Sequence, residues 1–222
     1  MIYLNEKGGD FLVNYAEAFK RPFLDIKKLV IGILLSFVPI INFFATGYLL
    51  ECAKSVAVKK KKKNYALPEW QNWGSLFVNG LLFYVISFIY MLVPFAIFWT
   101  GMAKAMGGMA QLLAAKNAAP QIVTTMGAYA VIAGVLFVAF SYFMYMAIVS
   151  FAVKGKFKEA FSADVFKKAF TMNYLGVWAL MMVFWIAASW LLSFVPYVGA
   201  AIASFVTGVI MFTAFGEAYI ES

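Results

Sequence analysis

Four polar side chains lie in or beside long apolar runs, and they are the residues with which this chain could do chemistry. Glu51 and Glu217 each close an apolar segment, and Asn42 and Asn79 interrupt or flank others. An ionisable residue inside a membrane segment indicates an ion, proton or lipid-headgroup site. The alternative is a carboxylate paired with a neighbour such as Lys54, and amides that make interhelical or turn hydrogen bonds. All four are candidate ligand-binding residues.

The sequence lacks the residue types and motifs that most enzymes use for catalysis. There is no histidine, and Cys52 is the single cysteine, so the commonest general base and nitrogen ligand for metals is missing. No nucleophile–base pair, metal-ligand cluster or cofactor motif occurs. Met102, Met106 and Met109 share one helical face, which suits Cu(I) in principle but is more typical of an apolar stripe. We therefore expect no catalytic residues, no metal and no cofactor.

The composition is that of a membrane protein. Of the 222 residues, 64% are hydrophobic and 13% charged, whereas soluble domains are about half apolar and about a quarter charged. We expect one integral membrane domain, residues 1–222. The net charge of +8 suits lysines at the cytoplasmic face and its anionic lipids better than nucleic acid. The expected partners are membrane lipids and either a second copy or another membrane protein.

Five consecutive lysines fix one loop to one face of the membrane, because charged side chains are costly in hydrocarbon. Trp70 and Trp73 follow this loop and suit the membrane–water interface. The loop binds lipid headgroups or serves only as a topology anchor. Its residues are Lys59, Lys60, Lys61, Lys62 and Lys63.

The apolar runs predict an all-α polytopic transmembrane bundle. The run from Leu29 to Leu50 turns at Pro39, and this hairpin within 22–58 consists of two short helices or is re-entrant. Residues 101–119 are expected to form an outer loop or a short interfacial helix. Amphipathic helices are expected at 10–20 and 156–170 on the cytoplasmic face. Four full spans, giving about six membrane helices with the hairpin, are expected at 75–99, 121–153, 174–194 and 198–219.

The distribution of cations orients the bundle. With these spans, sixteen of the 18 lysines and arginines fall on one side, and Lys104 and Lys116 on the other. The positive-inside rule then places both termini in the cytoplasm of a multi-pass cell-membrane protein. Glu6, Asp10 and Glu17 precede the first apolar run, so we expect that run to be retained and not cleaved as a signal peptide.

An internal repeat is suggested by the five letters of Leu35–Pro39, which recur in Leu192–Pro196. In both places a segment rich in Phe and Lys precedes an apolar leg, a proline turn, a second leg and a lone glutamate. The copies would be 10–58 and 156–222, related by an axis along the membrane normal. Chance identity in so biased a composition is the alternative.

The segment Leu67-Pro-Glu-Trp70-Gln-Asn-Trp-Gly74-Ser-Leu-Phe77-Val-Asn-Gly80 resembles a signature, LPEW-x-x-WG-x-LF-x-x-G, of a family of archaeal and bacterial multi-span membrane proteins. That family is catalogued as a domain of unknown function. The stretches Gly47–Glu51, Phe161–Asp164 and Gly216–Tyr219 are similar as well. The resemblance covers nearly the whole chain and implies an all-helical membrane fold, but no activity.

Two functions fit these observations. The first is a membrane binding or transport module for a lipid or a small hydrophobic solute, with Glu51 and Glu217 at the inner ends of its pathway. The alternative is a non-catalytic structural or assembly subunit of a membrane complex or homo-oligomer. A continuous cavity that reaches both glutamates would favour the first, and a packed core with an exposed apolar face the second.

Overall fold

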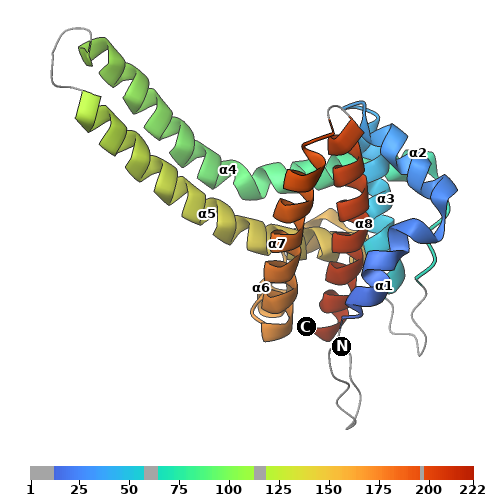
Figure 1. Cartoon of the computed structure of the whole chain (residues 1–222). Coiled ribbons are helices and arrows are strands. Elements are labelled where there is room, and N and C mark those ends of the chain that lie inside the picture. Colours follow the sequence, from blue (N-terminus) through green and yellow to red (C-terminus); the bar gives the residue numbers. More distant parts are fainter. Residues whose placement is uncertain (1–12, 58–64, 113–118, 196–197) are drawn as a thin grey trace. The chain divides into compact units, whose positions relative to one another are not determined.

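The chain folds into helices throughout the part that the structure, a computed structural model, describes: residues 13–57, 65–112, 119–195 and 198–222. No strand occurs within these ranges, so the all-α prediction is confirmed (Figure 1). The helices are α1 (Tyr15–Lys20), η1 (Arg21–Leu24), α2 (Ile26–Ser36), α3 (Asn42–Val56), α4 (Trp73–Leu112), α5 (Ala119–Lys154), η2 (Phe157–Phe161), α6 (Ala163–Ala169), α7 (Met172–Leu192) and α8 (Val198–Glu221).

Four of these helices are long and apolar enough to cross a membrane, as predicted. The qualifying segments are Trp73–Gly107, Met126–Lys154, Met172–Leu192 and Val198–Glu221. Local chemistry sets where they begin. Pro120 stands in the first turn of α5, where its missing N–H costs no hydrogen bond. The Thr171 hydroxyl accepts from the Tyr174 N–H at 3.4 Å and caps α7.

One prediction about the spans is wrong. Residues 101–112 were expected in a loop or separate short helix, but they continue α4 without a break to Leu112. The alanines and methionines of this stretch are strong helix formers, and Gly101 and Gly107 lower the helix propensity by only about 1 kcal/mol each. Polarity therefore did not indicate where the helix ends.

The N-terminal hairpin has the predicted form of two short helices joined by a turn. Helix α2 has 11 residues and α3 has 15, or roughly 16 and 22 Å at about 1.5 Å per residue. The Asp25 carboxylate accepts from the Lys28 N–H at 3.1 Å and caps α2. Both helices are shorter than a bilayer core of about 30 Å, and whether the hairpin is re-entrant stays a prediction.

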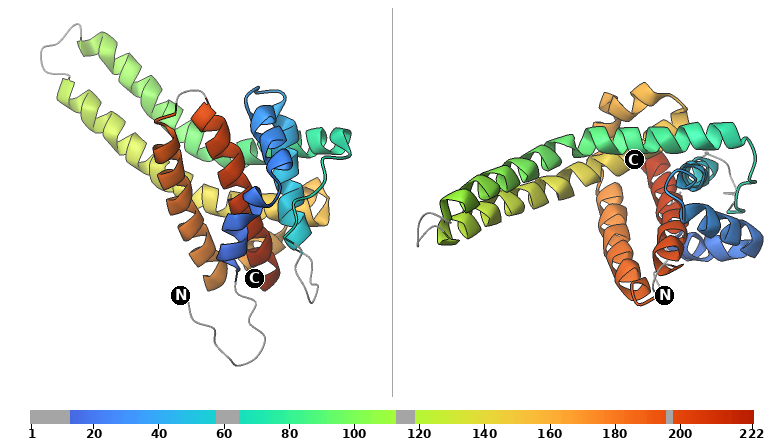
Figure 2. Two further views of the ribbon diagram at one scale, coloured as in Figure 1. Left: turned by 45° about the vertical axis from the view of Figure 1, so that its right-hand side comes forward. Right: turned by 90° about the horizontal axis from the view of Figure 1, so that it is seen from above.

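The described residues divide into two compact units. The first comprises Met1–Tyr84 and Met146–Ser222, and the second Val85–Tyr145. In the first unit α8 packs against α1, α2, α3 and α7, with α7 on one side and the N-terminal helices on the other (Figures 1 and 2). The single-domain prediction and the repeat stay predictions.

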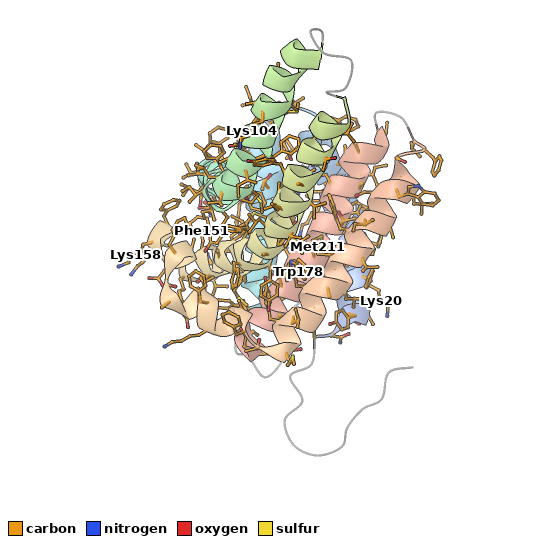
Figure 3. The ribbon with its side chains drawn as sticks, turned by 90° about the vertical axis from the view of Figure 1, so that its left-hand side faces the viewer. Lys20, Lys104, Phe151, Lys158, Trp178 and Met211 are labelled. Atoms are coloured by element: carbon orange, nitrogen blue, oxygen red, sulfur yellow. The ribbon has the colours of Figure 1, made fainter. Side chains whose placement is uncertain are left out.

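Helix α8 is the core of the first unit, because its side chains are buried from Thr207 to Tyr219. Phe151 and Met211, labelled in Figure 3, are each only 3% exposed. Glycines let the neighbouring helices approach closely. A Cβ on Gly208 would overlap the Leu49 side chain, and one on Gly216 would overlap the Ala53 carbonyl oxygen. The contacts advance along both helices in the same direction, from Leu49 and Gly208 to Ala53 and Gly216. Helices α3 and α8 therefore run parallel.

Two further glycines set the crossing of α3 with the first part of α4. A Cβ on Gly47 would overlap the Leu76 carbonyl oxygen, and one on Gly80 would overlap the Phe43 carbonyl oxygen. Each glycine thus lies against the backbone of the other helix, where any larger side chain forces the helices apart. Small residues serve the same purpose at membrane helix interfaces generally.

The amphipathic segments are shorter than predicted. At 156–170 the chain forms η2 and then α6, interrupted at Ser162, whose hydroxyl donates to the Glu159 carbonyl at 2.9 Å. Ser162 is the N-cap of α6 by position, but its side chain makes no cap hydrogen bond. Lys158 of η2 is exposed (Figure 3). In the N-terminal segment, helix begins at Tyr15, and residues 10–12 lie outside the described ranges.

The second unit is an antiparallel pair formed by the later part of α4 and the earlier part of α5. The two ribbons lie side by side in both views of Figure 2. A Cβ on Gly101 would overlap the Tyr129 side chain, so this glycine admits the tyrosine into the helix interface. No aspartate or glutamate occurs between residues 85 and 145.

Substituting alanine for Gly47 or Gly80 tests the α3–α4 crossing. Because the added methyl group meets backbone and not a movable side chain, we expect each change to lower the free energy of unfolding by about 1–3 kcal/mol. Gly176→Ala in α7 is the matched control, since nothing lies within 4 Å of its Cβ position. Thermal unfolding in detergent measures all three. Equal effects for Gly47→Ala and Gly176→Ala would contradict the close crossing.

Candidate functional site

The two candidate asparagines make hydrogen bonds inside the first unit. Asn42 Nδ2 donates to the Tyr84 hydroxyl at 3.0 Å, and Asn79 Nδ2 donates to the Ser75 hydroxyl one turn earlier in α4 at 3.3 Å. Asn42 also lines a pocket of about 430 Å³ at the α2–α3 turn, together with Phe37 and Phe43. The Asn42 contact is of the interhelical kind given as the alternative, whereas the Asn79 contact lies within α4. The pocket leaves Asn42 as a candidate ligand contact.

The two candidate glutamates lie in different environments. Glu51 is partly exposed, and its carboxylate lies 3.6 Å from the Lys54 ammonium one turn later. Glu217 is completely buried, and its Oε2 accepts from the Asn14 backbone N–H at 2.9 Å. Neither glutamate lines the Asn42 pocket. Matching positions in the predicted repeat do not give these residues matching surroundings.

Tyr65 connects Glu217 to the segment that follows the lysine loop. Burial is the main cause that raises the pKa of the Tyr65 phenol, and a side-chain hydrogen bond with Glu217 and its negative charge raise that pKa further. The phenol therefore stays protonated and able to donate to the carboxylate. Glu217 thus holds two segments, the start of α1 through Asn14 and the chain at Tyr65.

Arg21 is the buried cation of the same region, and sequence reasoning counted it only among the cytoplasmic charges. Its side chain is 0% exposed. Nε donates to the Tyr65 carbonyl at 3.1 Å, and Nη1 donates to the Cys52 carbonyl and the Thr213 hydroxyl, both at 2.9 Å. Nη2 donates to the Ser55 hydroxyl at 2.6 Å and the Ala66 carbonyl at 3.2 Å.

All five N–H groups of the guanidinium are therefore satisfied by neutral oxygens of the chain. A buried ion costs several kcal/mol unless its hydrogen bonds are made. Arginine meets this condition here because its donors form a planar fork that reaches several acceptors at once. One sequence signal pointed to it: Arg21 is the single arginine among 18 basic residues. We refer to Arg21, Ser55, Tyr65, Thr213 and Glu217 as the buried polar cluster.

The buried polar cluster also fixes both ends of the lysine loop. Cys52 and Ser55 lie near the end of α3, and Tyr65 and Ala66 lie after the loop. Arg21 binds all four, so the two stems are held together at one point. The lysines themselves, Lys59 to Lys63, lie outside the described residues, and their role as an interface anchor stays a prediction.

The Leu67–Trp70 segment packs onto α2 and α3. The Lys28 ammonium donates to the Leu67 carbonyl at 3.0 Å and to the Glu69 carboxylate at 2.7 Å. The Tyr48 hydroxyl donates to the Pro68 carbonyl at 2.8 Å. Trp70 stacks on the Tyr48 ring with centroids 4.0 Å apart. Every residue of this motif thus has a structural contact.

Trp73 follows the same aromatic row, with its ring 5.6 Å from that of Trp70, and is 44% exposed. The half-buried Trp70 indole N–H donates to the Lys28 carbonyl at 3.3 Å. The placement of both tryptophans at the membrane interface stays a prediction.

A second charged group lies where α5 meets α6. The Lys154 ammonium lies 2.8 Å from the Asp164 carboxylate and 3.1 Å from that of Glu159. The hydrogen bond from Lys154 lowers the pKa of the Asp164 carboxyl. All three side chains are partly exposed, so the group orients α6 and adds little stability. Among the described residues, no three of His, Cys, Asp and Glu are arranged to hold a metal ion.

Comparison with known families gives a match over most of the chain. The model of a family described as a protein of unknown function, DUF4013, matches residues 31–216. The chain belongs to the DUF4013 family. This match confirms the expected family of unknown function, while the prokaryotic distribution and the LPEW signature stay predictions. Neither the curated proteins nor the solved structures yielded a match.

Replacing Arg21 tests the buried polar cluster. In Arg21→Met the two hydroxyls and three carbonyls lose their shared donor, and we expect the free energy of unfolding to fall by about 3 kcal/mol or more. Arg21→Lys recovers only part of this, because an ammonium has three donors and no fork. The control is Lys20→Met at the exposed neighbouring position. A loss no larger than that of the control would contradict the role of Arg21.

The two glutamates should respond differently to removal. Glu217→Ala leaves the Asn14 N–H and the Tyr65 hydroxyl without their acceptor, and we expect a loss of about 1–3 kcal/mol. Glu51→Ala removes only a partly exposed ion pair, worth less than about 1 kcal/mol. Chemical unfolding in detergent compares them. Equal losses would contradict the prediction that burial makes Glu217 more important for stability than Glu51.

Proposed function

We propose that this member of the DUF4013 family is a non-catalytic structural or assembly subunit within a membrane. The observation that carries the proposal is that both buried charges bind groups of the chain itself. Arg21 donates all its hydrogen bonds to the chain's own groups, and Glu217 accepts from Asn14. A site that handles ions or solutes needs charged groups that exchange partners with a ligand.

The packing around Glu217 favours the same function. Gly216 lies against Ala53 and Val56 of α3, and Ala214, Phe215 and Ala218 are all buried. An ion or solute pathway at Glu217 would have to pass through this interface. A closely packed interior supports a role in holding helices in fixed positions.

The face of α7 directed away from α8 supports an assembly contact. Only 11% of the residues in the apolar 18-residue stretch of α7 are buried, against 72% in that of α8. Gly176, Ala179 and Ala187 are exposed on α7, and nothing lies within 4 Å of a Cβ built on Gly176. Small residues let a second transmembrane helix approach closely. We place the contact with a second copy of this chain on this face, in the predicted cell-membrane orientation with both termini cytoplasmic.

Lipid or small-solute binding is the second candidate function, and the Asn42 pocket favours it. This pocket is lined by Phe37, Pro39, Phe43 and Tyr84 around one amide, a combination of apolar walls with a few polar groups that is typical of small-molecule sites. Transport through it would require movement of the α2–α3 hairpin.

Native mass spectrometry from mild detergent tests the assembly role. We expect the full chain to form a homo-oligomer, and Gly176→Leu to weaken association about tenfold, equivalent to about 1.4 kcal/mol, because the leucine holds the second helix away. Gly74→Leu is the control, at another glycine with no atom within 4 Å.

The same preparations in liposomes separate the two candidate functions. An assembly subunit moves neither lipid nor ions, and Glu51→Gln and Glu217→Gln leave its oligomer unchanged. A chain that is monomeric at every concentration, or that moves a solute in a manner abolished by either glutamine, would contradict the proposal.

A further inference from the structure

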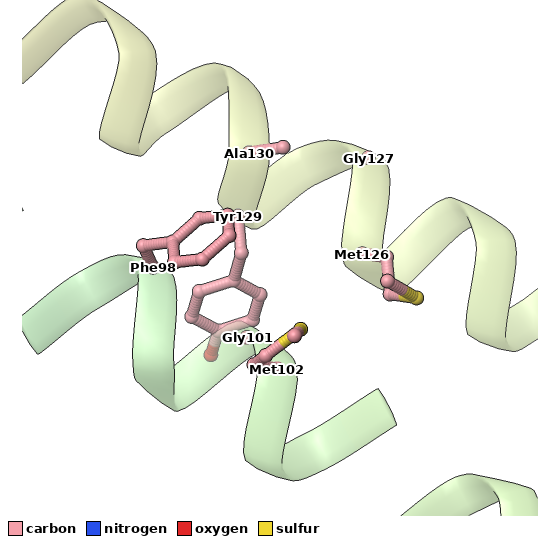
Figure 4. A pocket seen from close by; sticks show the side chains of 7 residues that line it. All are labelled: Phe98, Gly101, Met102, Met126, Gly127, Tyr129 and Ala130. Carbon is pink, nitrogen blue, oxygen red and sulfur yellow. The ribbon is translucent and has the colours of Figure 1, made fainter. Parts of the chain in front are cut away.

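The second unit contains an apolar pocket of about 190 Å³ between its two helices. Phe98 and Met102 line it from α4, and Met126, Gly127 and Tyr129 from α5 (Figure 4). Apolar cavities of on the order of 150 Å³ accept a molecule the size of benzene. The pocket therefore has room for part of a hydrocarbon chain.

A lysine is held at the edge of this pocket. The Lys104 ammonium donates to the hydroxyl of Tyr129, itself a pocket residue, at 2.6 Å, and lies 5.0 Å from the centre of the same ring. Lys104 stands three residues after Gly101, which also lines the pocket. The tyrosine thus holds a positive charge beside an apolar pocket.

The charge of Lys104 has no acid within its own unit to balance it, because residues 85–145 contain no Asp or Glu. Tyr129 offers the ammonium a neutral acceptor and a ring face, both compatible with a further anionic partner. An ammonium has three donors, so the bond to Tyr129 leaves donors for an anion.

The depth of the pocket in the membrane identifies the anion. No charged residue occurs between Trp73 and Lys104 in α4, or between Lys116 and Lys154 along the chain to the end of α5. The pocket residues thus lie towards the ends of the two predicted spans, where hydrocarbon gives way to headgroups. Trp99, 62% exposed beside the pocket residue Phe98, suits the same interface. A lipid phosphate lies at this level, and its acyl chains lie on the apolar side.

We infer that the second unit binds an anionic phospholipid, with one acyl chain in the pocket between Phe98, Met102 and Met126 and the phosphate on Lys104. This site shares no residue with the buried polar cluster or with the assembly face on α7. The bound lipid joins α4 and α5 at the end of the hairpin, which adds to the assembly role a preference for anionic membranes.

Lipid titration of the full-length protein tests this inference. Delipidated protein in mild detergent receives dioleoyl phosphatidylglycerol or dioleoyl phosphatidylcholine, and native mass spectrometry counts the lipids retained. A lysine near the headgroups is worth about 1 kcal/mol towards anionic lipid, which corresponds to an approximately fivefold preference. We expect Lys104→Gln to abolish that preference and Lys104→Arg to keep it. Lys20→Gln, at an exposed lysine of α1, is the control for general loss of charge.

Filling the pocket tests the acyl-chain contact independently. Nothing lies within 4 Å of a Cβ built on Gly127 or on Gly134 two turns later, so leucine fits at both. Gly127→Leu enters the pocket and should reduce lipid retention about fivefold or more, while Gly134→Leu, outside the lining, should not. The inference is overturned if both lipids bind equally, if Lys104→Gln behaves as Lys20→Gln does, or if the two leucine variants lose lipid equally.

Discussion

A guanidinium group removed from water must donate every N–H to an acceptor, and this requirement organises the first unit. Arg21 meets it with five acceptors drawn from α3, α8 and the segment at Tyr65 and Ala66. Since unsatisfied donors on a buried ion are costly, the three segments can separate only by breaking several hydrogen bonds at once. The stems of the lysine loop and the central helix α8 are thereby held in one arrangement.

The membrane explains why such a network suits this chain. Between helices in lipid there is little hydrophobic driving force, so close packing and interhelical hydrogen bonds hold the bundle together. Close packing is provided by glycines that let neighbouring groups lie against the helix backbone, at Gly47, Gly80, Gly208 and Gly216. Hydrogen bonds between segments are provided by Arg21 and Glu217 near one end of α8. This member of the family of unknown function thus has a helical core held by close packing and by hydrogen bonds.

Much of the fold could be predicted from the sequence. Composition and apolar run length gave the four spans, because about 20 apolar residues are what a bilayer requires. The continuation of α4 to Leu112 could not be read from polarity, because Ala- and Met-rich sequence favours helix in water and lipid alike. The division of 156–170 at Ser162 depends on a local hydrogen bond to Glu159 that periodicity does not show.

The candidate site was harder to predict. Glu51 and Glu217 have the same sequence surroundings, each closing an apolar leg, but burial depends on which helices pack against them. In the sequence, Arg21 is one of several neighbouring basic residues and looks like Lys20. Only its contacts with residues distant in sequence, such as Thr213, distinguish the two. The Lys104 pocket needed two spans brought together before its apolar lining and its charge lay side by side.

A double-mutant cycle between Arg21 and Thr213 tests the central claim most directly. The free energies of unfolding of Arg21→Met, Thr213→Val and the double variant are measured in one detergent. The hydrogen bond at 2.9 Å between a buried cation and a hydroxyl predicts a coupling energy of about 1.5 kcal/mol or more. Losses that add within about 0.5 kcal/mol would show that Arg21 does not join α8 to the rest of the unit.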